Sequence, residues 1–381
     1  MNNLKPFFDA LSNIAHGSIE IELPNGEIKK FSSLDNQPTA HFKIKDLAMV
    51  DDCLVGGDIG LAETYMKDMW ESKNLPDLLL FFALNAEALE SFFHAHKIKM
   101  FLLYLQAIFR KNTHNGSKKN IQFHYDLGND FYRLWLDKTM TYSSAIFEGR
   151  DLDLKDAQKN KYNRILSKLS DGKNILEIGC GWGGFASEAV ACGYNVTGLT
   201  LSKEQEKYAN DLGLDHFKIK LQDYRKEKNK YDNIVSIEMF EAVGKEYWNT
   251  YFQTIKRSLN KGGKAVIQTI TIDEKVYKSY KSRVDFIQKH IFPGGFLPSK
   301  SEFIRLAKAN ELEVVESFEF GFDYQKTLLK WFKNFNQVNQ KILELGFDEQ
   351  FIRKWQFYLA YCVAGFGSKR TDVVQFVLKI S

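Results

Sequence analysis

The sequence has few cysteines, and their spacing is not typical of a zinc site or of a disulfide framework. Four are present among 381 residues, at positions 53, 180, 192 and 362, and no two of them form a C-x-x-C pair. This argues against a zinc site built on thiolates and gives no support to a secreted disulfide framework. We expect no metal site elsewhere, because no carboxylate or cysteine lies at ligand spacing from His94, His96 or His114.

Long apolar runs are missing as well. No stretch reaches the roughly 18 apolar residues that a transmembrane helix needs. Residues 1–17 also contain no apolar segment of signal-peptide length and no small-residue cleavage pattern. We therefore expect a cytoplasmic protein.

The chain has no large excess of charge of one sign. The net charge is +4, from 52 Lys and Arg and 48 Asp and Glu, and this balance does not favour nucleic acid as a partner. The distribution is uneven, because residues 91–125 hold six basic residues and no acidic one: Lys97, Lys99, Arg110, Lys111, Lys118 and Lys119. Such a stretch is either a solvated face or a contact surface for an anionic membrane.

The length predicts two or three domains. Residues 1–95 are typical of a small α+β unit, in which 18–23 and 27–31 form a hairpin about the turn Pro24-Asn25-Gly26. Helices are expected over 61–70 and 75–85, after a break at Gly56-Gly57-Asp58. We predict a basic helix and linker over 96–119 and a second, larger domain over 120–381.

The larger domain alternates apolar runs with helical patterns. Strands are predicted over 174–178, 195–200, 233–237 and 264–271, and helices over 156–169, 184–192, 203–212 and 246–259. This βαβ order predicts an α/β fold with a doubly wound, mainly parallel sheet.

The sharpest local signal is a glycine-rich turn after the first of these strands. Glu177 lies near the strand's end, and Gly179, Gly181 and Gly183 follow at alternate positions before a helix. Glycines allow the backbone to turn tightly and to approach a ligand closely. The pattern lacks the Gly-Lys-Ser/Thr of a phosphate loop and differs from G-x-G-x-x-G. Its carboxylate favours a zwitterionic amino-acid moiety over a pyrophosphate.

This segment resembles motif I of the Rossmann-like class I methyltransferases that use S-adenosylmethionine. The usual acid that binds the ribose is missing after the next strand, where Thr200 and Gln205 are the available polar side chains. Gln222 and Asp223 are expected on the adenine side. The alternative to a cofactor contact is that each of these polar side chains lies at the end of a strand and is only solvated.

Five stretches occur in the order seen in the cyclopropane-fatty-acyl-phospholipid synthase family, which the chain resembles over nearly its whole length. They are 124–131 (HYDLGNDF), 142–147 (YSSAIF), 176–184 (LEIGCGWGG), 239–244 (MFEAVG) and 290–298 (HIFPGGFLP). The resemblance implies methyl or methylene transfer from S-adenosylmethionine to the double bond of a phospholipid acyl chain. It also implies cofactor contacts for Tyr142 and Ser143.

The family's proton acceptor is ascribed to a bound bicarbonate, so the resemblance implies a possible second cofactor. The matching positions in this chain are Glu241, Tyr324, the backbone at Ile270, Ser144 where the family has Cys, and Gln268 where it has His. Ala242 stands where a His often follows the Glu. Ser144 and Gln268 either still donate hydrogen bonds to bicarbonate, or the site removes a different proton.

Two product classes therefore stay open, a cyclopropane ring and a methylated or methylene fatty acid without ring closure. A small-molecule N-methyltransferase is a third alternative, which the extra N-terminal region disfavours. The resemblance places the protein at the inner membrane face as a peripheral enzyme whose partners are phospholipid acyl chains, and it leaves open a homodimer.

Overall fold

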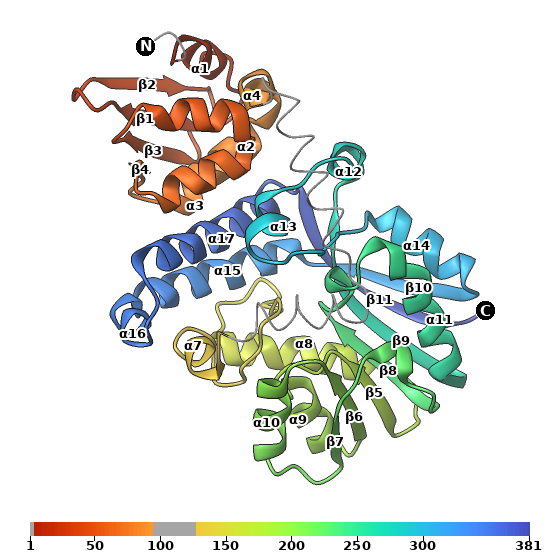
Figure 1. The fold of residues 1–381 in the computed structure, drawn as a ribbon. Helices are drawn as coiled ribbons and strands as arrows, with labels where there is room; N and C mark the ends of the chain where they lie inside the picture. The colour runs from red at the N-terminus through yellow and green to blue at the C-terminus, as the bar shows by residue number, and fades with distance from the viewer. Residues whose placement is uncertain (1–3, 94–126) are drawn as a thin grey trace. The chain divides into compact units, whose positions relative to one another are not determined.

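The computed structural model describes residues 4–93 and 127–381, and it divides into two compact units (Figure 1). One unit contains the described residues 4–93 with 279–291 and 328–370, and the other contains 127–278, 292–327 and 371–381. The sequence predicts one domain over 120–381, whereas 279–291 and 328–370 group with the N-terminal unit. The predicted linker 96–119 and most of the basic stretch 91–125 lie outside the described residues.

The larger unit is built on a seven-stranded sheet in the order β10-β11-β9-β8-β5-β6-β7. Its strands are β5 (Asn174–Ile178), β6 (Asn195–Thr200), β7 (Phe217–Leu221), β8 (Tyr231–Ile237), β9 (Leu259–Ile272), β10 (Leu312–Glu319) and β11 (Thr371–Ile380). The first five are parallel to one another, and β11 is antiparallel to both β9 and β10. The predicted α/β fold is confirmed, and the antiparallel pair is an addition to it.

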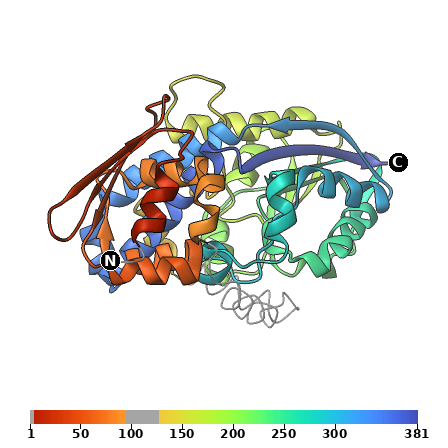
Figure 2. The same cartoon turned by 90° about the horizontal axis from the view of Figure 1, so that it is seen from above.

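Helices cover both faces of this sheet. Adjacent residues of a strand face opposite sides, and both sides of these parallel strands are apolar. Ile175 and Val235 pack with Phe185 in one apolar core, while Leu176 and Ile234 pack with the second core. Figure 2 shows α8 on one side of β11 and α11 and α14 on the other. The helices of this unit are α7 (Asn129–Arg133), α8 (Leu154–Lys168), α9 (Gly184–Ala191), α10 (Lys203–Asp211), α11 (Trp248–Ser258) and α14 (Lys300–Ala309). Short 3-10 turns η1 (Tyr224–Lys226), η2 (Phe240–Ala242) and η3 (Lys245–Tyr247) follow β7 and β8.

The N-terminal unit contains a four-stranded sheet in the order β2-β1-β3-β4. The predicted hairpin is present as β1 (Ser18–Glu22) and β2 (Ile28–Ser32), and β3 (Thr39–Ile44) and β4 (Trp70–Glu71) complete the sheet. Its helices are α1 (Leu4–Leu11), α2 (Ala48–Met66), α3 (Leu75–Leu84), α4 (Ala86–Phe93), α13 (Phe286–His290), α16 (Asn339–Glu344) and α17 (Glu349–Gly367). Two further helices, α12 (Glu274–Tyr280) and α15 (Gly321–Asn336), extend across the boundaries of the units along the chain.

The predicted break at Gly56-Gly57 is a kink within α2 rather than its end. Gly57 has φ 57° and ψ −132°, which is not a helical conformation, yet helix continues on both sides. The only residue type that adopts such angles readily is glycine. The predicted boundary at Gly56-Gly57-Asp58 is therefore wrong, because α2 continues through it.

An ion cluster in the N-terminal unit gives a pH-dependent prediction. The carboxylate of Glu63 accepts hydrogen bonds from His290 at 2.9 Å and from Lys289 at 2.5 Å. The His290 hydrogen bond is the largest cause that lowers the Glu63 pKa from 4.5 to about 2. A lowered carboxyl pKa stabilises the fold above pH 4.5, and this contribution is lost as the pH falls towards 2. We expect Glu63→Gln to lower the free energy of unfolding at pH 7 and to do so less at pH 3. Urea titrations at both pH values measure this free energy, and the exposed Glu87→Gln serves as the control. An equal loss of stability by Glu63→Gln at pH 7 and pH 3 would contradict the prediction.

Candidate active site

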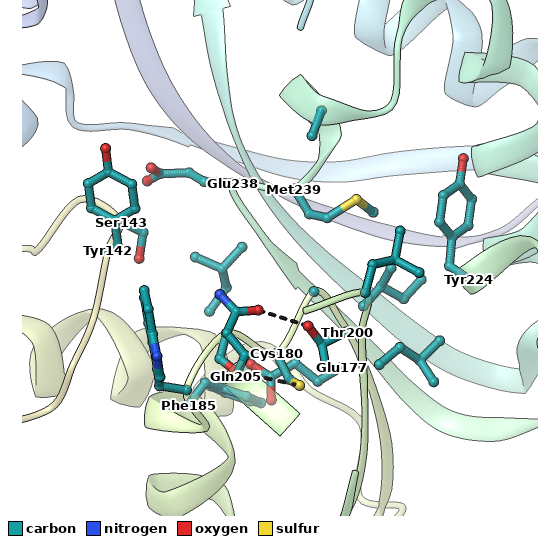
Figure 3. Close-up of a pocket in the computed structure, with 18 of the residues that line it drawn as sticks. Tyr142, Ser143, Glu177, Cys180, Phe185, Thr200, Gln205, Tyr224, Glu238 and Met239 are labelled. Carbon is teal, nitrogen blue, oxygen red and sulfur yellow. Dashed lines mark hydrogen bonds between the residues drawn. The ribbon is translucent and has the colours of Figure 1, made fainter. Parts of the chain in front are cut away.

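A pocket opens at the carboxyl ends of the parallel strands, where ligands bind in sheets of this kind (Figure 3). Its walls come from the turns after β5, β6, β7 and β8 and from the segment 140–143. Nine of the ten predicted cofactor residues line it: Tyr142, Ser143, Glu177, Gly179, Gly181, Thr200, Gln205, Gln222 and Asp223. The tenth, Gly183, does not border the pocket but precedes α9 as its N-cap, with φ 86°.

The glycine turn brings the backbone against the pocket. Gly179 has φ +81°, and a β-carbon built there would lie 2.7 Å from Cγ of Met239. The N–H groups of Gly179 and Cys180 both donate to the carbonyl of Leu199 at 3.0 Å, which ties the turn to β6. Because these two N–H groups are already used, the turn offers a close approach more than a set of free donors.

Glu177 brings an unpaired carboxylate oxygen to the pocket. The residue is 3% exposed, and its Oε2 atom is buried without a hydrogen-bond partner. Burial raises the pKa of this carboxyl well above its usual value, and the nearby Lys161 opposes the shift. A buried acceptor needs a donor, and the ammonium group of a methionine moiety supplies one. The site therefore fits S-adenosylmethionine.

Thr200 and Gln205 supply polar groups to the ribose side of the pocket, where the usual acidic residue is missing. The Thr200 hydroxyl accepts from Ser202 N–H at 3.1 Å and donates to Gln205 Oε1 at 2.8 Å. The Gln205 amide N–H group is thereby left for a ligand, and it offers donors to sugar hydroxyls in place of a carboxylate acceptor.

Gln222 and Asp223 hold the rim beyond β7. The Gln222 amide donates to Glu227 at 3.0 Å, and Asp223 forms a 2.5 Å ion pair with Arg225. Both side chains line the pocket as predicted, but their polar groups also fix the turn η1.

Three of the five positions that the family resemblance placed around a bicarbonate, namely Ser144, Gln268 and Tyr324, meet at the carboxylate of Glu238. Its Oε1 atom accepts from Ser144 N–H at 2.8 Å and from Gln268 Nε2 at 2.7 Å, and its Oε2 atom accepts from Tyr324 at 2.6 Å. The Ser144 hydroxyl points elsewhere, since it donates to the carbonyl of Ala145 at 3.0 Å. The backbone and not the side chain of Ser144 therefore serves the site.

Glu241 lies one turn later and has separate partners. Its Oε1 atom accepts from Thr269 Oγ1 at 3.0 Å and from the backbone N–H of Ile270 at 2.5 Å, while Oε2 is buried without a hydrogen bond. Burial, and then the charge of Glu238, raise the Glu241 pKa to about 8. With this pKa the Glu241 carboxyl is mainly protonated at neutral pH.

Neither Glu238 nor Lys161 is among the site residues predicted from the sequence. Glu238 directly follows β8, in the same end-of-strand position as the residues that were predicted, so its placement was available as a signal. Lys161 is 0% exposed on the inner face of α8, and its ammonium donates to Ser143 Oγ at 2.6 Å. Its spacing from the buried Ala157 and Ile165 marks a charged residue on an apolar stripe, which indicates a role inside the protein.

Within residues 4–93 and 127–381, every helix is too short or too polar to span a bilayer. In the same described part, no group of three or more His, Cys, Asp and Glu side chains is arranged to hold a metal ion.

Comparisons with known proteins agree with this geometry. The family model described as mycolic acid cyclopropane synthetase matches residues 111–376. The chain is 36% identical to the tuberculostearic acid methyltransferase of Mycobacterium tuberculosis, over 84% of this chain and 79% of that protein. It is 34% identical to the cyclopropane-fatty-acyl-phospholipid synthase of Escherichia coli, over 91% and 89%. A solved structure of a mycolic acid cyclopropane synthase complexed with SAH and CTAB matches with a TM-score of 0.64 and 33% identity, over 68% of this chain and 97% of that one.

Proposed function

Because the chain belongs to the mycolic acid cyclopropane synthetase family and is an S-adenosylmethionine-dependent methyltransferase, we propose that it acts on the double bond of an unsaturated phospholipid acyl chain and forms a cyclopropane ring. The observation that carries this proposal is a single pocket that joins the glycine turn to a carboxylate cradle. Glu177, Gly179 and Glu238 all line this pocket.

The reaction sets three demands on the protein. The cofactor supplies an electrophilic methyl group, and the alkene is a weak nucleophile that becomes a carbocation when it takes up that group. The site must exclude water, stabilise the cation and accept a proton. Aromatic rings line the pocket, among them Tyr142, Trp182 and Phe185, and their faces stabilise a desolvated cation. Glu238 and Glu241 supply the carboxyl groups that can exchange this proton.

A methylated or methylene product without ring closure is the second candidate. Two observations favour it: the relative of 36% identity is a tuberculostearic acid methyltransferase, and Ser144, Gln268 and Ala242 depart from the usual family residues. Methyl transfer is common to both products. The two products differ in what the electron pair of the broken C–H bond becomes. It forms the closing C–C bond of the ring in the first product and a C=C bond in the second.

We place the reaction at the cytoplasmic face of the membrane, where acyl chains of phospholipids are reached from the interface. The basic stretch 91–125 would support electrostatic attraction to anionic lipid. This proposal makes the lipid surface the partner of the enzyme and needs no spanning helix.

Incubation with phospholipid vesicles and methyl-labelled S-adenosylmethionine tests the function. We expect label in lipids with an unsaturated acyl chain, with the mass gain of one CH2 group and no double bond left for derivatisation. Vesicles with saturated chains are the control and should stay unlabelled. A labelled lipid that keeps a double bond would identify the second candidate, and label found only in an added small amine would overturn the proposal.

A further inference from the structure

Three hydrogen-bond donors converge on the Glu238 carboxylate and occupy both of its oxygens. They are the N–H of Ser144, the amide of Gln268 and the hydroxyl of Tyr324, at 2.8, 2.7 and 2.6 Å. These are three of the five positions that the family resemblance assigned to an external bicarbonate. In this chain the protein's own carboxylate fills the cradle.

The orientation of Gln268 is fixed by a relay that ends at an arginine. Arg164 can only donate, and it donates to Oε1 of Gln375 at 2.9 Å. The Gln375 amide N–H group therefore points at Oε1 of Gln268, at 2.9 Å, from the opposite position on the paired strand. This leaves only the N–H group of Gln268 for the site, so Gln268 requires an acceptor there.

The backbone of Glu238 indicates that its side chain is needed. Its φ is +50°, in the left-handed region that favours glycine, and its N–H donates to the carbonyl of Gln268 at 2.8 Å. A glycine would adopt this conformation without strain. A strained residue that persists at the wall of a pocket points to a use for its side chain.

The Glu238 carboxyl group borders the pocket, where a ligand can reach it. Glu238 lines the pocket beside Met239, with Tyr142 and Ser143 on the same side (Figure 3). The buried side chain of Lys161 donates to Ser143 Oγ at 2.6 Å and interacts electrostatically with Glu238, while burial lowers the Lys161 pKa to about 7. Burial raises the pKa of Glu238 above its usual value, and the hydrogen bond from Tyr324, the charge of Lys161 and the hydrogen bonds from Ser144 and Gln268 oppose this rise.

We propose that Glu238 is the resident anion of this site, that it replaces bicarbonate, and that it is the proton acceptor of the reaction; the last part rests on the proposed function. The alkene π electrons form the bond to the methyl carbon as the carbon–sulfur bond breaks and its pair stays on sulfur. Glu238 then takes one proton from the new methyl group. The electron pair of that C–H bond closes the ring on the cationic carbon, and Glu238 leaves the step as a neutral acid.

A binding experiment tests the resident anion without turnover. With S-adenosylhomocysteine present, we expect 13C-bicarbonate to show no line broadening with the wild-type protein. Glu238→Gly removes the carboxylate and relieves the strained backbone, so it should bind bicarbonate at millimolar concentration. Bicarbonate binding by the wild type at this site, or none by a folded Glu238→Gly, would overturn the proposal.

Turnover in carbonate-free buffer tests the proton acceptor. Wild-type turnover should be unchanged when bicarbonate is removed, and Glu238→Gly should lose at least about 100-fold, with partial rescue by added bicarbonate or formate. Glu238→Gln keeps the shape of the side chain and should be inactive without rescue. The matched control is Glu313→Gln, at an exposed ion pair with Lys379. Wild-type stimulation by bicarbonate, or full activity of Glu238→Gln, would contradict the assignment. If the wild type labels no lipid, the proposed function fails, and the binding experiment still decides whether Glu238 is the resident anion.

Discussion

Valine at position 179 is expected to abolish binding of S-adenosylmethionine. Gly179 has φ +81°, where a β-branched side chain is strained, and its β-carbon would press on Met239 in the wall of the pocket. The new methyl groups would also stand where the backbone must approach the methionine moiety. We expect the dissociation constant to rise by at least about 100-fold, since each 1.4 kcal/mol of lost binding is tenfold.

Titration calorimetry with S-adenosylmethionine measures this effect, and circular dichroism checks that the variant is folded. Gly193→Val is the matched control, because Gly193 has the same φ of +81° but a β-carbon there meets nothing within 4 Å. The control carries the same backbone strain away from the pocket, so it should lose stability and keep cofactor affinity. Unchanged affinity in a folded Gly179→Val protein would defeat the assignment of the cofactor site.

Glu241→Gln is expected to lower turnover by about 100-fold or more while leaving cofactor affinity intact. The charge of Glu238 helps to hold Glu241 protonated, with a pKa of about 8. When a proton reaches Glu238 this charge is lost, the Glu241 pKa falls, and Glu241 can release its own proton. Glutamine keeps the hydrogen bonds of Oε1 to Thr269 and Ile270 but cannot exchange a proton. General acid–base groups contribute about 10²–10⁴-fold to rates.

The measurement is initial-rate incorporation of labelled methyl into lipid as a function of pH. Wild-type turnover should show a macroscopic transition near pH 8, and the variant should lack it. Glu313→Gln again serves as the control and should keep both the rate and the transition. Near-wild-type turnover of Glu241→Gln would remove Glu241 from the catalytic residues and would leave the binding test of Glu238 unaffected.

Local pattern was enough to predict much of the larger unit. Two predicted strands, 174–178 and 195–200, agree with β5 and β6 to the residue, because apolar runs bounded by turn residues are a local property. The insertion of β11 between β9 and β10 was missed. That pairing joins residues more than 50 positions apart, and no local pattern encodes it.

The candidate site was predictable in the same measure. The glycine turn and the polar residues after β6 and β7 were found because each lies beside a recognisable strand end. The position of the Glu238 carboxylate, where an external anion was expected, was not predicted. It depends on where three donors from distant segments meet. Ser144 shows this most clearly, since its residue type suggested a hydroxyl donor while the structure uses its N–H.

The insertion of β11 also bears on the order in which the protein matures on the ribosome. Residues 371–380 form an inner strand of the sheet, and residues 349–367 form α17, which packs Phe357 against Trp70 in the N-terminal unit. Neither apolar core is complete until the last 40 or so residues have been made. Both units of a nascent chain therefore have incomplete cores until synthesis is nearly finished. A premature stop near residue 340 would thus leave two incomplete units rather than one intact domain and one missing segment.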